Sequence, residues 1–182
     1  MRLVLNFENP NIRNVVVRSY AVGDAESLVQ HANNKKVWLN MRDRFPHPYE
    51  LSDAEAWIKI ATTNVEGECN LAIAIDDKVV GGVGITPQTD VHSKTAEFGY
   101  WLGEEHWGKG IMSTVVNQIS EYFFENFDLV RLYATVFAWN PASAKVLEKC
   151  GWAFEGRSRK SVFKDGKYCD QLLFAKIKGE CN

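Results

Sequence analysis

This sequence has little of what several large classes of protein require. Its four cysteines form no C-x-x-C pair and have no histidine partners at metal-ligand spacing, which argues against a zinc site and a disulfide framework. No segment is long and apolar enough for a membrane span, and the first residues lack the apolar core and cleavage site of a signal peptide. We therefore expect reduced thiols that serve as packing residues, no metal, no membrane contact and a cytoplasmic location.

An excess of charge of one sign is also missing. The 182 residues carry 21 Lys and Arg against 23 Asp and Glu, for a net charge of −2. Binding to nucleic acid needs a basic surface, and the densest basic run, Arg157 to Lys160, is short. We therefore predict no nucleic-acid partner. No repeat or linker interrupts the chain, which is long enough to bury one core, so a single domain over residues 1–182 is expected.

Hydrophobic periodicity divides the chain into alternating helices and strands. Asp24 is the expected N-cap of the first helix, Ser52 with Glu55 reads as a capping box, and Gly151 suits the end of the last helix. Strands are predicted over 15–19, 71–75, 79–85, 95–102, 130–137, 152–155 and 168–176, and helices over 24–33 and 52–63, from Gly108 through Phe123, and from Pro141 to Gly151. Short turns at 76–78 and 164–166 join neighbouring strands. This order predicts an α+β fold of three layers (α/β/α), in which a mixed sheet lies between helices.

The most informative segment is the glycine turn Trp107–Ser113, which lies between a predicted strand and an amphipathic helix. A helix N-terminus presents unpaired N–H groups and a partial positive charge, and glycines at 108 and 110 let the backbone approach an anion closely. The turn does not fit GxxxxGK[ST], because Gly110 stands after Lys109 where the motif needs Ser or Thr. The segment therefore predicts a phosphate site that is not a P-loop.

Three motifs in order resemble the GNAT superfamily of N-acetyltransferases and its RimJ/RimL-like branch. They are EFGYWLGEEHWGKGIMSTVV, LYATVFAWNPASAKVLEKCGW and EGRSRKSVFKDGKYCDQLLFAKI. The resemblance implies a mainly antiparallel central sheet and acetyl-CoA as the donor. Its pyrophosphate is expected on the Gly108–Ser113 amides, its pantetheine arm along Tyr100–Leu102, and its thioester near the N-x-x-S element of Asn140 and Ser143. The residues predicted to bind the cofactor are Tyr100, Trp101, Leu102, Trp107, Gly108, Lys109, Gly110, Ile111, Met112, Ser113, Asn140 and Ser143.

Two positions depart from the pattern of the superfamily. Glu105 stands where Gln or Arg usually precedes the glycines. Leu147 stands where many members carry the Tyr that protonates the departing thiolate, so that mechanism cannot be transferred. We predict that Ser143 supplies this proton, directly or through a water.

The acceptor amine must lose a proton before it can attack, and a nearby carboxylate can take it. Strand alternation places Glu97 on one face with Trp101, and Glu97 is the predicted base. His106, Glu104 and Glu105 are alternatives, and a purely structural ion pair would explain Glu97 as well. N–H groups near Trp101 are expected to hold the oxyanion.

The loop RDRFPHPY and the last hairpin are expected to form the acceptor pocket. The predicted substrate-binding residues are Arg42, Phe45, His47, Tyr49 and Tyr168. The predicted function is acetyl transfer to a primary amine, either a peptide N-terminus or a small molecule such as a polyamine or aminoglycoside. The alternative function is a non-catalytic acyl-CoA-binding or interaction module. The alternative role of the loop is only to connect two elements. The oligomeric state is open, with a homodimer as the commonest symmetric assembly.

Overall fold

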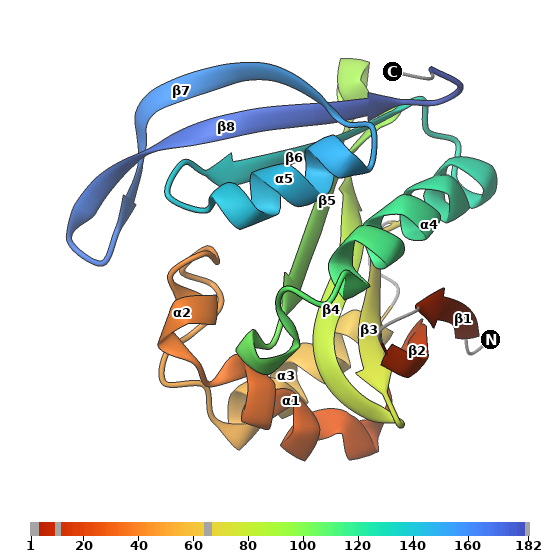
Figure 1. Cartoon of the computed structure of the whole chain (residues 1–182), viewed down its shortest axis with the longest axis vertical. Helices are drawn as coiled ribbons and strands as arrows, with labels where there is room; N and C mark the ends of the chain where they lie inside the picture. The colour runs from red at the N-terminus through yellow and green to blue at the C-terminus, as the bar shows by residue number, and fades with distance from the viewer. Residues whose placement is uncertain (1–3, 10–11, 64–66, 181–182) are drawn as a thin grey trace.

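The computed structural model describes residues 4–9, 12–63 and 67–180, and all of its strands belong to one eight-stranded sheet (Figure 1). The sheet order is β1-β2-β3-β4-β5-β6-β8-β7. Every neighbouring pair is antiparallel except β5 and β6, which are parallel. The strands are β1 (Val4–Asn9), β2 (Ile12–Ser19), β3 (Cys69–Ile75), β4 (Lys78–Pro87), β5 (Thr95–Leu102), β6 (Arg131–Phe137), β7 (Ala153–Lys164) and β8 (Lys167–Ile177).

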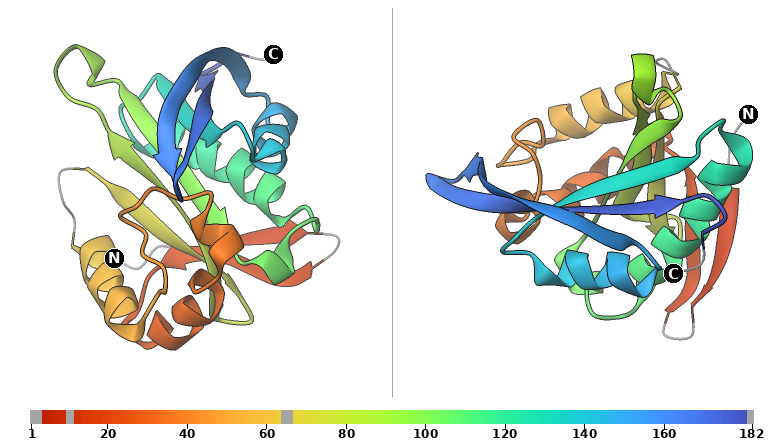
Figure 2. Two further views of the ribbon diagram at one scale, coloured as in Figure 1. Left: turned by 90° about the vertical axis from the view of Figure 1, so that its left-hand side faces the viewer. Right: turned by 90° about the horizontal axis from the view of Figure 1, so that it is seen from above.

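Helices cover both faces of this sheet (Figures 1 and 2). The α-helices are α1 (Ala25–Ala32), α2 (Lys35–Trp38), α3 (Leu51–Thr62), α4 (Ile111–Asn126) and α5 (Pro141–Lys149), and the 3-10 turns are η1 (Val22–Asp24), η2 (Asp90–His92) and η3 (Glu104–His106). Residues of α4 and α5 form one buried core with the sheet, and α1 and α3 form a second core on the opposite face. The predicted three-layer α+β fold with a mixed, mainly antiparallel sheet is confirmed.

Helix α4 shows why the sequence places this layer so clearly. Ile111, Val115, Val116, Ile119 and Phe123 repeat at helical spacing, and each is at most 1% exposed. Burying one such side chain contributes about 1.5–3 kcal/mol, so the stripe fixes α4 on the sheet. The helix begins at Ile111 after a left-handed Gly110, not at Gly108 as predicted, because the two glycines form the turn that precedes it.

Asp24 is the N-cap residue of α1, as predicted, whereas the predicted capping box of α3 needs correction. Asp24 precedes α1, but its carboxylate makes no cap bond with the helix; it binds the Arg18 guanidinium through two contacts of 2.7 Å, and both side chains are buried. The capping box of α3 uses Glu50 and Asp53 in place of Ser52 and Glu55, since the Glu50 N–H donates to the Asp53 carboxylate at 2.8 Å.

The two ends of the described chain hold more strand than predicted. Strand β1 was missed, and the last hairpin is 12 and 11 residues long instead of two short pieces. Its turn was placed correctly. Asp165 and Gly166 both have positive φ, at 50° and 73°, as a type I′ turn requires. The long hairpin matters because it reaches from the sheet toward the loop that follows α2.

The described cysteines agree with their prediction as packing residues. Cys69, Cys150 and Cys169 are free thiols, and the latter two are buried. Cys181 lies outside the described residues. Within the described ranges, helices are all too short or too polar to cross a membrane.

Candidate active site

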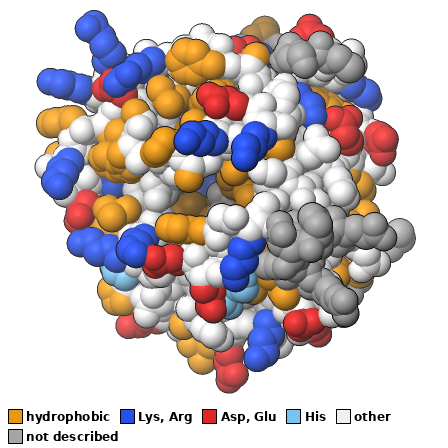
Figure 3. All heavy atoms as spheres, in the orientation of Figure 1, with side chains coloured by type: hydrophobic (Ala, Val, Ile, Leu, Met, Phe, Trp, Pro, Cys, Tyr) orange, Lys and Arg blue, Asp and Glu red, His pale blue; other side chains and the backbone are white. Residues whose placement is uncertain are grey.

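The candidate site lies where the two parallel strands of the sheet separate. β5 pairs with β6 only from Thr95 opposite Arg131 to Glu97 opposite Tyr133. Beyond that point, β5 remains paired with β4 as far as Leu102, and β6 remains paired with β8. The strands therefore diverge, and in the space-filling view of the same orientation the surface is hollowed at this place (Figures 1 and 3). We call this feature the opening between β5 and β6.

Main-chain groups of β5 are directed into the opening in alternation. The Gln88 N–H donates to the Thr95 carbonyl at 2.9 Å, which shows that odd-numbered residues of β5 bond to β4. The N–H of Trp101 therefore faces β4 and is not available to an oxyanion. The groups of Tyr100 and Leu102 face the other way, into the opening, although the Leu102 carbonyl already accepts from the Trp107 indole at 2.7 Å.

The glycine turn follows directly from the end of β5. Gly108 and Gly110 have φ of 73° and 78°, a region that other residues enter only at a cost of about 1 kcal/mol or more. A side chain added at Gly108 would meet no atom within 4 Å, so space remains beside this backbone. Gly110 then precedes α4, and the first N–H groups of a helix have no acceptor within the helix and point toward an anion site.

The N-x-x-S element forms the start of α5. Asn140 Oδ1 accepts the Ser143 N–H at 3.2 Å, and Pro141 occupies the first turn. The Tyr100 hydroxyl lies 2.8 Å from Ser143 Oγ and 3.2 Å from its carbonyl oxygen. Burial raises the pKa of Tyr100, so the phenol stays neutral and keeps its proton. The sequence predicted both residues, but not that their side chains meet.

The predicted base meets a predicted substrate-binding residue. Glu97 is 19% exposed at its side chain, and its carboxylate forms an ion pair with Arg42. The Thr135 hydroxyl from β6 donates to the same carboxylate at 3.5 Å. The structure thus places Glu97 at the narrow end of the opening, where β5 and β6 cease to pair.

The alternative bases lie on η3, where they contact the first helices. Glu104 is bound by Asn34 and Lys36, which together hold the pKa of its carboxyl below the usual value. Glu105 lies 3.1 Å from His31, and the ring of His106 lies 5.2 Å from the His31 ring. These contacts tie all three candidates to α1 and α2 and leave Glu97 as the carboxylate at the opening.

The other residues predicted to bind the acceptor divide into buried or half-buried residues and exposed ones. Phe45 packs against Trp101, with ring centroids 5.6 Å apart. Tyr49 is only 4% exposed, and burial raises its pKa to about 12, so it supports Phe45 from within the core. His47 stacks on Trp38 at 5.5 Å. Tyr168 is 69% exposed near the end of the hairpin and does not join the others.

A contact that was not predicted connects the hairpin with the acceptor loop. Lys164 is buried, its Nζ lies 2.7 Å from Asp43 Oδ1, and the same atom lies 3.7 Å from the centre of the Trp38 ring. Figures 1 and 2 show the end of the hairpin beside α2. In the sequence this pair is only two opposite charges on distant segments, and a single sequence does not show that they meet.

A parallel pair of strands that separates beside a glycine turn and a helix start is suited to a phosphate-bearing ligand. Comparisons with known proteins identify the family. The acetyltransferase (GNAT) domain family matches residues 14–153. An uncharacterized N-acetyltransferase p20 of Bacillus licheniformis is 30% identical over 91% of this chain and 94% of its own length. The spermidine N(1)-acetyltransferase of Vibrio cholerae is 25% identical over 86% and 88%.

Solved structures agree with this assignment. Microcin C7 self-immunity acetyltransferase MccE, in complex with acetyl-CoA and AMP, has a TM-score of 0.79 and 25% identity over 93% of this chain and 97% of its own. RimJ of Mycobacterium smegmatis shares the fold, with a TM-score of 0.84 and 22% identity over 98% and 88%. The chain belongs to the GNAT acetyltransferase family. The predicted resemblance and the predicted class, an acetyl-CoA-dependent N-acyltransferase, are confirmed.

Proposed function

We propose that this chain acetylates a primary amine by direct attack on acetyl-CoA within a ternary complex. The observation that carries the proposal is the opening between β5 and β6, which has the glycine turn and Ser143 on one side and the Glu97 carboxylate at its narrow end. The donor and the acceptor would thus contact different groups, so both could bind in the opening at the same time.

The donor would bind through main-chain groups. Its pyrophosphate would accept bonds from the turn and from the first N–H groups of α4, where the helix dipole favours negative charge. Its pantetheine amides would pair with Tyr100 and Leu102, since the other edge of β5 is occupied by β4. The thioester would then lie between β5 and the first turn of α5, near Ser143.

The acceptor would approach Glu97 as an ammonium ion. Because Arg42 already pairs with this carboxylate, the incoming ammonium has to displace the guanidinium or share the carboxylate with it. Glu97 then takes one proton, directly or through a water, and the nitrogen lone pair attacks the thioester carbon. No covalent acetyl-enzyme is required, so the cysteines need no role in the reaction.

Collapse of the tetrahedral intermediate breaks the carbon–sulfur bond and releases a thiolate. Ser143 would donate its hydroxyl proton to the sulfur and recover a proton from solvent. The Tyr100 hydroxyl can donate to Ser143 Oγ, which leaves the Ser143 proton directed elsewhere. Tyr100 is then a positioning residue that compensates for the absence of a Tyr at 147. The oxyanion would be held by a β5 N–H directed into the opening.

An acetyl-CoA consumption screen over peptides with free N-termini, amino acids, aminoglycosides and polyamines tests this proposal. We expect turnover with at least one class. Because Arg42 lies beside Glu97, an acceptor with several positive charges should be a poorer substrate than one with a single amine. If acetyl-CoA binds but no class of amine is turned over, the alternative, a non-catalytic acyl-CoA-binding module, is favoured.

The free thiols support our further proposal of a cytoplasmic location. Sedimentation would test for a homodimer.

A further inference from the structure

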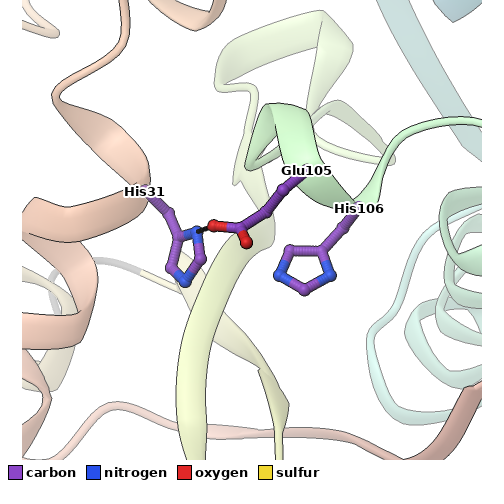
Figure 4. Close-up of side chains that lie close together, drawn as sticks. All are labelled: His31, Glu105 and His106. Atoms are coloured by element: carbon purple, nitrogen blue, oxygen red, sulfur yellow. Dashed lines mark ion pairs between the residues drawn. The ribbon is translucent and has the colours of Figure 1, made fainter.

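Away from the opening, three potential metal ligands lie together where α1 meets η3 (Figure 4). His31 comes from α1, and Glu105 and His106 come from η3; one ligand atom from each lies within 4.8 Å of the others. We propose that these residues bind one divalent transition-metal ion of the Zn²⁺ type. The family assignment gives no role to this cluster, and His31 lies too far from Glu105 and His106 in the sequence to form a spacing motif with them.

The geometry of the cluster is close to what a metal needs. His31 Nδ1 lies 3.1 Å from Glu105 Oε1. Two ligands at about 2.0–2.1 Å from a tetrahedral zinc are about 3.3 Å apart, so this pair already has the spacing of one edge. The Glu105 carboxylate lies between the two imidazole rings (Figure 4). The ligand atom of His106 lies within 4.8 Å of the other two, so a movement of about 1.5 Å or less, which a side-chain rotation achieves, completes the set.

The backbone beside the cluster is shaped to admit His31. A Cβ at Gly103 would lie 2.8 Å from His31 Nδ1 and 3.1 Å from its Cβ, which is closer than side chains can approach. Gly103 has φ of −58°, a conformation open to any residue, so only the space for His31 requires glycine there. The absence of a side chain at Gly103 therefore leaves room for the His31 imidazole against the start of η3.

A hollow of about 470 Å³ lies beside the cluster and is lined by Gln30, His31, Asn34, Glu104 and Glu105. A metal held by two histidines and one carboxylate would have its fourth position open to a water in this hollow. The ion would join α1 to η3, which leads into the glycine turn. Glu104 is already bound by Lys36 and Asn34, so it is not a ligand in this proposal and provides the matched control.

Titration of the full chain, after treatment with a chelator, tests the site without acetyl-CoA or turnover. Calorimetry with ZnCl₂ should give one ion per chain. Glu105→Gln should weaken binding by roughly tenfold or more, whereas Glu104→Gln should leave it unchanged. The Glu105 side chain is 62% exposed, so this variant should fold even if a change at the buried His31 does not. His106→Gln should weaken binding to a similar extent.

Co²⁺ provides a second measurement, because its visible spectrum reports the ligands. The wild-type chain and Glu104→Gln should show the bands of a nitrogen and oxygen site, and these bands should be lost in Glu105→Gln. The proposal is overturned if neither ion binds, if both ligand variants bind as tightly as the wild type, or if the cobalt spectrum shows thiolate ligation. In each of those cases the cluster is an ion pair and a ring contact only.

Discussion

The donor side and the acceptor side of the opening are built in different ways. On the donor side, the turn from Trp107 to Ser113 depends on two left-handed glycines and a helix start, all within seven consecutive residues. On the acceptor side, Arg42 meets Glu97 and Asp43 meets Lys164, so each contact joins segments far apart in the chain. In the proposed site, local backbone geometry would thus hold the donor, whereas tertiary contacts would shape the acceptor pocket.

This difference explains how much each side can vary. A phosphate site made of N–H groups tolerates few backbone conformations but almost any side chain that leaves the amides free. An acceptor pocket made of side chains on a loop and a hairpin can change its chemistry without disturbing the fold. We therefore expect changes on the donor side to abolish acetyl-CoA binding, and changes on the acceptor side to alter which amine reacts.

The largest expected effect is at Gly108. Gly108→Glu should abolish measurable acetyl-CoA binding in calorimetry, because it places a carboxylate beside the pyrophosphate site. Gly166→Glu is the matched control, since Gly166 has the same φ of 73° and similarly open surroundings but lies in the hairpin turn. Equal binding by both variants would show that the turn does not hold the pyrophosphate.

Glu97 should show the next largest effect, on chemistry and not on donor binding. Glu97→Gln should lower kcat by roughly 10²–10⁴-fold at neutral pH and leave the KM for acetyl-CoA nearly unchanged. The loss should shrink as pH rises, because more of the acceptor is then free amine and needs no base. The pH-rate profile measures this, with the exposed Glu125→Gln on α4 as control. A uniform loss at every pH would contradict the role of base.

Sequence reasoning reached the donor side because its signals are local. The glycines, the stripe of α4 and the helix start at Pro141 each depend on residues a few positions apart, and the structure places these elements almost as predicted. The start of α4 was misjudged by three residues because a glycine turn and a helix start share the same residues. The main-chain direction at Trp101 needed the register of β4 on β5, which one strand alone does not reveal.

The acceptor side was predicted only in outline. The sequence indicated the loop around Arg42 and Phe45, but it could not show that Arg42 binds Glu97 or that Tyr49 is buried beneath Phe45. Those facts depend on the distance between segments after folding. The capping box of α3 also could not be decided from the sequence. Ser52 with Glu55 and Glu50 with Asp53 are both candidates, and only the observed bond to Asp53 decides between them.

Tyr100 tests whether the donor side also contributes to chemistry. Tyr100→Phe removes the hydroxyl that lies 2.8 Å from Ser143 Oγ and keeps the ring in the core. We expect kcat to fall by about tenfold with little change in the KM for acetyl-CoA, and the fall in Ser143→Ala to be larger. The double variant should be no worse than Ser143→Ala, since Tyr100 acts through Ser143. Additive losses would show that the two hydroxyls act independently.

The smallest expected effect concerns the link between the hairpin and the acceptor loop. Lys164→Met keeps the aliphatic stem but removes the charge that lies between Asp43 and the Trp38 ring. The free energy of unfolding should fall by about 1 kcal/mol, because Asp43 is 76% exposed and can be solvated without its partner. The KM for the acceptor should rise several-fold, since the hairpin is no longer fixed beside Trp38. Acetyl-CoA binding should stay unchanged, and a parallel loss of donor affinity would show that the two sides of the opening are not separate.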